Sequence, residues 1–230
     1  MSPDVSRETP PAPPQAQGVF SDALPVAEAF AALLATDGIV RGLIGPREVP
    51  RLWERHLLNC AGVSDLVEDG QVVADLGSGA GLPGLVLAIQ RPEVQVVLVE
   101  PLLRRAAFLS EAVLELGLRN TLVRRSRAED LHGKLLVDAV TARAVAPVDR
   151  LAGWALPLLH PGGRLLALKG AKADEELEQA RPVLRRLGAR AWSVVEVGSA
   201  DLGTAGRVVV VEAGAPATKA PAAAKRKGRR

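Results

Sequence analysis

The chain contains few of the residues that build disulfide frameworks, stacking surfaces or histidine-based sites. Its 230 residues include one cysteine, no tyrosine, three histidines, three tryptophans and three phenylalanines. A single cysteine excludes an internal disulfide and is typical of a reducing compartment. Long apolar runs are broken by charges or glycine clusters, and the N-terminus has neither the basic nor the apolar region of a secretory signal. These absences predict a soluble, cytoplasmic protein with no membrane span.

The hydrophobic content is sufficient for one substantial core. Hydrophobic residues make up 48% of the chain, which at this length favours one main domain with an appendage. The two ends differ from the rest because they are rich in proline, alanine and charge, and such segments bury too little apolar surface to order themselves. We predict a disordered tail at 1–18, a helical N-terminal appendage at 19–62, a main domain at 63–213 and a disordered basic tail at 214–230.

The positive charge is concentrated at the C-terminus. The formal net charge is +3 and the isoelectric point is about 9.4, but residues 214–230 alone carry six positive charges and no acid. The remainder of the chain is therefore mildly acidic and must bind anions through local patches. Two interpretations of the tail stay open: it raises the affinity for a polyanion through counterion release, or it only aids solubility.

Strand-like and helix-like segments alternate after residue 70. We expect strands at 72–76, 94–100, 121–125, 138–142, 164–169, 190–197 and 207–212, and helices at 82–91, 102–117, 147–159 and 173–187. Such alternation predicts a mostly parallel sheet with helices on both faces and a ligand at the carboxyl ends of the strands. No helix separates the last two strands, so they should pair antiparallel. The expected fold class is α/β, Rossmann-like, with a seven-stranded sheet and an antiparallel edge strand.

The most informative motif is the glycine-rich loop DLGSGAGLPG at 75–84, which directly follows a buried strand. Its second half matches the dinucleotide pattern G-x-G-x-x-G, and Glu100 ends the next strand, where a ribose-binding acid is expected. Its first half, Asp75 followed by Gly77 and Gly79, matches the acid and glycines of class I S-adenosylmethionine (SAM) methyltransferases. An acid here can orient the ammonium of SAM and would repel a pyrophosphate. We therefore favour SAM over a dinucleotide.

Three later segments fit the same cofactor. The carboxylate of Glu100 can accept hydrogen bonds from both ribose hydroxyls. Ala128 and Glu129 lie in a turn after the third strand, where an adenine ring can rest, and Glu129 is a candidate to contact its edge. Arg143 follows the fourth strand and can pair with an acid of the site or with an anionic substrate.

A basic amphipathic helix is expected at 46–61. Arg47, Arg51 and Arg55 are four residues apart on one face, and two interpretations stay open: a solvated surface, or contact with RNA phosphates. His56 falls within the apolar stripe of this helix, which favours a partly buried, hydrogen-bonded role over that of a catalytic base.

Five short segments occur along the chain, and their combination in this order identifies a family more specifically than any one of them alone. They are RLWERHLLN at 51–59, DLGSGAGLPG at 75–84, RAE at 127–129, ARAVA at 142–146 and LKG at 168–170. Together they resemble the RsmG or GidB family of bacterial small-subunit rRNA methyltransferases, over residues from about 47 to 212. The resemblance implies a helical appendage on a seven-stranded SAM domain, and methylation of guanine N7 in the 530 loop of 16S rRNA (family position 527).

The resemblance also implies roles for individual positions. Gly77, Leu82, Ala128, Glu129 and Arg143 match the SAM site of the family. Asn59-Cys60 departs from the acid and serine of many members, and the basic tail is not a general family feature.

Guanine N7 is nucleophilic without losing a proton, so methyl transfer to it needs positioning and no general base. We accordingly predict no catalytic residue and no metal site. Arg143 and Lys169 are candidate substrate contacts, and RNA-binding candidates are Arg47, Arg51, Arg55 and Lys172. The expected partner is 16S rRNA or the small ribosomal subunit, with the protein acting as a monomer away from membranes. The alternatives are an NAD-type oxidoreductase and a non-catalytic RNA-binding module.

Overall fold

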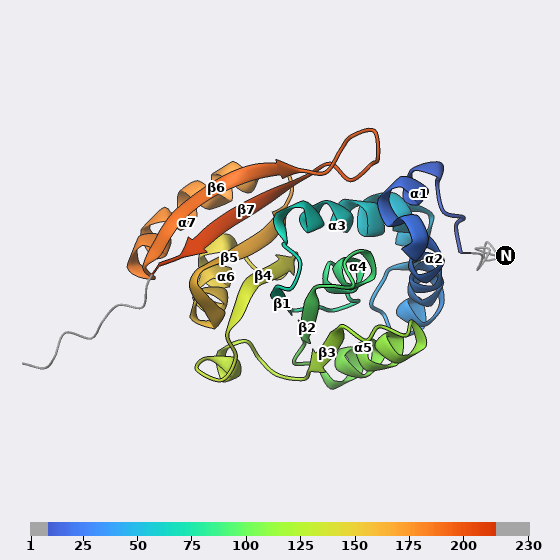
Figure 1. Cartoon of the computed structure of the whole chain (residues 1–230), viewed down its shortest axis with the longest axis horizontal. Helices are drawn as coiled ribbons and strands as arrows, with labels where there is room; N and C mark the ends of the chain where they lie inside the picture. The colour runs from blue at the N-terminus through green and yellow to red at the C-terminus, as the bar shows by residue number, and fades with distance from the viewer. Residues whose placement is uncertain (1–8, 215–230) are drawn as a thin grey trace, which may run out of the picture.

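A seven-stranded sheet organises the chain, whose residues 9–214 are described by a computed structural model (Figure 1). The strands are β1 (Val72–Leu76), β2 (Gln95–Val99), β3 (Thr121–Arg124), β4 (Val137–Arg143), β5 (Leu159–Lys169), β6 (Ala189–Val197) and β7 (Gly206–Ala213). Their order is β3-β2-β1-β4-β5-β7-β6. Strands β1 to β5 are mutually parallel, and β7 pairs antiparallel with both β5 and β6. The predicted fold class is confirmed, with one refinement: β7 lies inside the sheet, and β6 forms the edge opposite β3.

Helices cover both faces of the sheet. They are α4 (Gly84–Gln90), α5 (Leu103–Glu115), α6 (Val148–Ala155) and α7 (Ala173–Arg186). Side chains alternate along the buried strands, so Val73 and Leu98 belong to the core beside α4 and α5, while Leu76 and Val99 belong to the core beside α6. Residues 84–89 of α4 are all buried, because this helix lies between the sheet and the N-terminal segment.

The N-terminal segment is a series of short helical pieces. They are α1 (Pro14–Phe20), η1 (Ser21–Ala23), α2 (Leu24–Leu33), η2 (Leu34–Gly38), η3 (Pro46–Arg51), η4 (Leu52–Leu58), α3 (Asn59–Ala61) and η5 (Gly62–Leu66). Their apolar side chains share one core with α4 and α5. In Figure 1, α1 and α2 lie beyond α4, at the end of the molecule opposite β6. This segment therefore packs directly on the sheet domain.

The prediction of disorder over residues 1–18 is wrong for the second half of that range. Helix α1 begins at Pro14, Ala16 is fully buried, and the indole Nε1 of Trp53 donates to the carbonyl of Pro10 at 3.0 Å. Proline is well tolerated in the first turn of a helix, and the apolar surface that orders this segment comes from distant parts of the chain. The predicted basic tail lies outside the described residues apart from Gly214.

One helical run, Pro14–Gly38, is long and apolar enough to cross a membrane by length and composition alone. Its Ala27, Phe30, Ala31 and Leu34 are fully buried within the protein core. Their burial is what a core helix of a folded domain requires.

Candidate functional site

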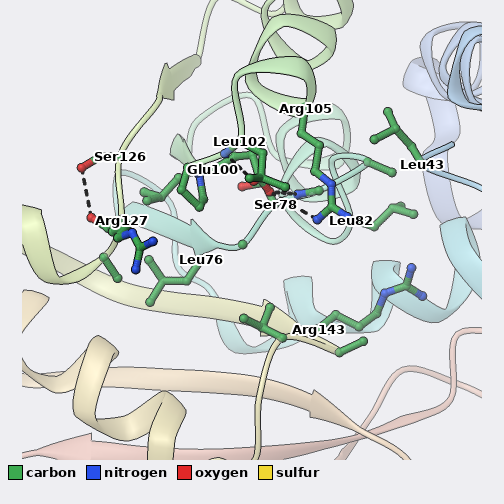
Figure 2. A pocket seen from close by; sticks show the side chains of 18 of the residues that line it. Leu43, Leu76, Ser78, Leu82, Glu100, Leu102, Arg105, Ser126, Arg127 and Arg143 are labelled. Atoms are coloured by element: carbon green, nitrogen blue, oxygen red, sulfur yellow. Dashed lines mark hydrogen bonds and ion pairs between the residues drawn. The ribbon is translucent and has the colours of Figure 1, made fainter. Parts of the chain in front are cut away.

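A cavity of about 630 Å³ opens at the carboxyl ends of β1, β2 and β4. Its wall combines the glycine loop after β1, residues 100–102 after β2, the turn at 126–129, residues 143–145 after β4, and Leu43, Ile44 and His56 of the N-terminal segment. Figure 2 shows Glu100, Ser78 and Leu102 together in this wall, with Arg105 reaching toward them and Arg143 on the side of β4. Segments distant in sequence thus meet at the end of the sheet where a ligand is expected.

The glycine loop requires glycine for two separate reasons. Gly77, Gly79 and Gly81 have φ values of +67°, +56° and +91°, a region that other residues rarely adopt. A Cβ on Gly77 would also lie 2.9 Å from Cγ2 of Val145. The loop backbone therefore packs tightly on the segment after β4, and its other side faces the cavity.

Asp75 supports this loop from behind. Its side chain is fully buried, Oδ2 accepts the N–H of Gly84 at 3.1 Å, and Oδ1 accepts the hydroxyl of Thr141 at 3.3 Å. Burial raises the pKa of this carboxyl from its ordinary 3.8 to about 7, against the lowering effect of its hydrogen bonds. Asp75 does not line the cavity. The side chain of Asp75 therefore does not reach a ligand in the cavity, and the expected repulsion of a pyrophosphate cannot arise from direct contact with this carboxyl.

Glu100, in contrast, lies in the cavity wall. Its Oε2 accepts the N–H of Gly79 at 3.0 Å and its Oε1 accepts the N–H of Leu102 at 2.9 Å. Nη1 of Arg105 is 4.0 Å from Oε2. The residue is only 2% exposed, but a carboxylate has about four lone-pair positions, so acceptor capacity remains toward the cavity.

Most of the predicted cofactor residues are brought together. Leu82, Ala128, Glu129 and Arg143 line the same cavity as the glycine loop and Glu100; Asp75 is the one that does not. The guanidinium of Arg143 is held by the N-terminal segment: Nη2 contacts Nδ1 of His56 at 3.0 Å, and Nη1 donates to the carbonyl of Arg55 at 3.1 Å.

Of the six predicted substrate and RNA contacts, Arg143 lines the cavity and the other five lie outside its wall. Nζ of Lys169 donates to the carbonyl of Ala146 at 2.8 Å and pairs with Oε2 of Glu176 at 2.7 Å. It therefore fixes the segment after β4. The other four, Arg47, Arg51, Arg55 and Lys172, are exposed and do not line the cavity.

Sequence reasoning missed several lining residues, among them Arg105, Leu43 and Trp154. Arg105 had a detectable signal, because it lies in the first turn of the helix that follows Glu100. Leu43 and Trp154 had none, since they reach the cavity only through tertiary packing.

The polar and apolar groups of the cavity wall suit an adenosine-containing ligand. The wall offers a carboxylate for hydroxyl groups, exposed backbone of a glycine loop, and apolar surface from Leu76, Leu82 and Leu102. Pockets of this size that combine apolar walls with a few placed polar groups are typical ligand sites. Within residues 9–214, no group of three or more His, Cys, Asp or Glu side chains is placed to hold a metal ion.

Comparison with known proteins assigns a family to this arrangement. The model of the GidB family, described as rRNA small subunit methyltransferase G, matches residues 24–203. The ribosomal RNA small subunit methyltransferase G of a Nocardioides species is 58% identical over 211 residues, covering 91% of this chain and 84% of that protein. The protein of the same name from Thermobifida fusca is 58% identical over 196 residues, covering 85% and 83%.

A solved structure supports the fold. A SAM-dependent O-methyltransferase from Thermotoga maritima superposes with a TM-score of 0.51 at 15% identity, covering 70% of this chain and 66% of that one. At this identity the likeness shows the class I methyltransferase fold alone.

Proposed function

The chain belongs to the rRNA small subunit methyltransferase G family, and from that premise we propose that it transfers the methyl group of SAM to N7 of a guanine in the 530 loop of 16S rRNA. The family membership supports a SAM-dependent enzyme acting on small-subunit rRNA. It does not support the two alternatives, an NAD-type oxidoreductase and a non-catalytic RNA-binding module.

One observation carries the proposal at the level of the site. The buried carboxylate of Glu100 stands in the cavity wall and is tied to the glycine loop through the N–H of Gly79. This contact fixes the acceptor for a ribose and the open backbone of the loop relative to each other. A cofactor with a ribose between two other parts is held in one orientation by such a pair.

We assign the cofactor contacts as follows. When bound, SAM supplies a methyl group on a positively charged sulfur. Glu100 accepts the ribose hydroxyls, while Ala128 and Glu129 hold the adenine. Gly77 and Gly79 let the amino-acid portion approach the loop backbone, and Leu82 adds apolar contact. Asp75 acts indirectly, by anchoring the loop to the start of α4.

No general base is needed for the transfer. Guanine N7 carries a free lone pair, and the imidazole in the cavity wall, that of His56, already has both nitrogens engaged by Glu48 and Arg143. Catalysis then rests on placement: holding two reacting groups in line at roughly 3–3.5 Å converts a bimolecular step into an effectively unimolecular one. Arg143, at the cavity rim, is assigned to an anionic group of cofactor or substrate.

RNA contact is assigned to exposed basic residues. Arg47, Arg51, Arg55 and Lys172 project from the surface, where cations bind phosphates without base specificity. Nη1 of Arg55 lies 3.2 Å from the carboxylate of Glu48, so an RNA phosphate would compete with Glu48 for this guanidinium. We propose that the protein works as a soluble cytoplasmic monomer on 16S rRNA, naked or assembled into the small subunit.

The direct test is methyl transfer in vitro. The protein is incubated with methyl-labelled SAM and either naked 16S rRNA or small subunits from a strain that lacks this methylation. Digestion of the RNA should give the label in 7-methylguanosine. Label in another nucleoside would overturn the assignment to N7, and comparison of the two substrates identifies the state in which the RNA is recognised.

A further inference from the structure

The segment Arg143–Ala146, which we call the rim loop, is clamped at both ends. At its start, Arg143 is held by His56 and by the carbonyl of Arg55. At its end, the carbonyl of Ala146 accepts a hydrogen bond from Nζ of Lys169 at 2.8 Å. Two elements far apart in sequence, η4 and β5, therefore determine where this loop lies.

The interior of the rim loop has a strained backbone and contacts the glycine loop. Ala144 has a φ of +55°, a backbone conformation that is unfavourable for alanine and persists only where the surroundings impose it. Val145, the next residue, occupies the space that a side chain on Gly77 would need. A change in the hold on Arg143 is thus transmitted within two residues to the glycine loop.

The contacts of His56 determine its protonation state. A guanidinium has donors and no acceptor, so the Nδ1 that faces Arg143 must present its lone pair. Nε2 then carries the proton and donates to Oε2 of Glu48 at 3.0 Å. His56 is neutral, in the Nε2–H tautomer, and links η3 to the cavity wall through η4.

The electrostatic surroundings agree with this state. The side chain of His56 is 14% exposed. Burial, followed by the positive charge of Arg143, lowers its pKa below the ordinary 6.5, and Arg55 acts in the same direction, while Glu48 raises it. The charged groups that face the imidazole are therefore Glu48 on η3, Arg55 on η4 itself, and Arg143 on β4.

We propose that His56 is a positioning residue for methyl transfer, which holds the guanidinium of Arg143 in one orientation at the cavity rim and acts on the reaction only through Arg143. This role rests on the proposed methyl transfer. The segment that carries Arg51 and Arg55 then also determines the position of Arg143 in the cavity wall. The proposed RNA-binding surface and the cofactor site are therefore connected through these contacts.

A double-mutant cycle tests whether His56 acts through Arg143. We compare His56→Leu, Arg143→Met and the double variant in single-turnover methyl transfer. We expect His56→Leu to slow transfer roughly tenfold in the wild-type background and to have no further effect in the Arg143→Met background, because interacting residues are non-additive. Independent, multiplicative losses would overturn the proposal.

A conservative variant separates positioning from structural support. In His56→Asn, Oδ1 replaces Nδ1 as an acceptor for Arg143 but cannot take up a proton. We expect this variant to recover most of the rate lost in His56→Leu. Because the pKa of His56 is lowered from the ordinary 6.5, the wild type should lose rate only when the pH falls below this lowered pKa, where an imidazolium repels Arg143, and His56→Asn should lack this acid limb. The same acid limb in both proteins would contradict the proposal. His160→Asn, at an exposed histidine, is the matched control.

A spectroscopic measurement is independent of methyl transfer. In the full chain labelled with ¹⁵N-histidine, the resonances that vanish in His56→Asn belong to His56. We expect an unprotonated Nδ1 and a protonated Nε2 at neutral pH, with a changed Nδ1 shift in Arg143→Met. A protonated Nδ1 would overturn the arrangement. If the tautomer is as expected but the wild type transfers no methyl group to rRNA, the proposed function is wrong, while the contacts of His56 with Arg143 and Glu48 are confirmed.

Discussion

At the residue scale, the carboxyl groups of Asp75 and Glu100 show how strand geometry separates two similar side chains. Both follow from recognisable motifs, yet only Glu100 lies in the cavity wall. Asp75 lies two residues after Val73 on β1 and therefore faces the same side of the sheet, the side covered by α4. The motif identified the loop that lines the cavity, but not that Asp75 points away from the cavity, which follows from the alternation of side chains along the strand.

The buried carboxyl of Asp75 predicts a pH-dependent effect of Asp75→Asn. Because the pKa in the folded protein, about 7, is above the ordinary 3.8, the wild type is stabilised at low pH and loses this stabilisation as the pH rises through 7. Asparagine does not titrate, and it can accept from Gly84 and donate to the hydroxyl of Thr141. Between pH 5 and 8 we expect the free energy of unfolding of the wild type to fall by roughly 3 kcal/mol relative to the variant. Urea denaturation at both pH values measures this; a difference that is the same at pH 5 and 8 would refute it.

Glu100→Ala tests the ribose contact. Removing the carboxylate takes away the acceptor and leaves the N–H groups of Gly79 and Leu102 without their partner. Hydrogen bonds to charged groups contribute about 1.5–3 kcal/mol, so we expect the dissociation constant for SAM to rise roughly ten- to hundredfold. Isothermal titration calorimetry measures it, with the exposed Glu93→Ala as control. Unchanged SAM affinity in Glu100→Ala would remove this residue from the cofactor site.

At the element scale, local pattern predicted the sheet better than the N-terminal helices. The central strands are buried runs of Val, Leu and Ala, whereas the edge strands β3 and β6 are mostly exposed or half-buried. All seven strands were located within a few residues, except that β5 begins earlier, at Leu159. The single helix expected at 46–61 is instead η3, η4 and α3, because Pro50 interrupts the regular hydrogen bonding. Helix α1 had no local signal, since the surface that buries Ala16 comes from distant residues.

The contact between the glycine loop and the rim loop predicts the effect of Gly77→Ala. The substitution places a Cβ at a φ of +67° and 2.9 Å from Val145, so it costs backbone strain of about 1 kcal/mol and displaces a residue of the cavity wall. We expect lower thermal stability and a SAM dissociation constant raised roughly tenfold or more.

Gly70→Ala is the matched control for this prediction. Gly70 has a φ of +79° with nothing within 4 Å of the added Cβ, so it carries the backbone strain alone. It should lower stability without changing SAM affinity. If both variants bound SAM equally, the contact between the two loops would have no role in cofactor binding.

At the scale of the whole molecule, the N-terminal segment and the sheet domain share one core and one cavity wall. Arg51 and Arg55 of the N-terminal segment are exposed to solvent. We expect replacement of Arg51 and Arg55 together by glutamine to lower rRNA methylation and to reduce its salt dependence, because fewer phosphate contacts release fewer counterions. SAM affinity should change little. The matched control replaces Arg181 and Arg186, exposed on α7. Equal loss of SAM binding and methylation would show that the two arginines act on the fold instead.

The central claim is that this cavity places a methyl group on N7 of one guanine. Methylation at N7 makes the RNA chain cleavable by borohydride and aniline, so primer extension after this treatment maps the modified nucleotide. Small subunits incubated with wild-type protein and SAM should acquire one new cleavage site, at a single guanine in the 530 loop, and Glu100→Ala should produce it far more slowly. Scission at a different guanine, or methyl incorporation with no new scission, would contradict the account.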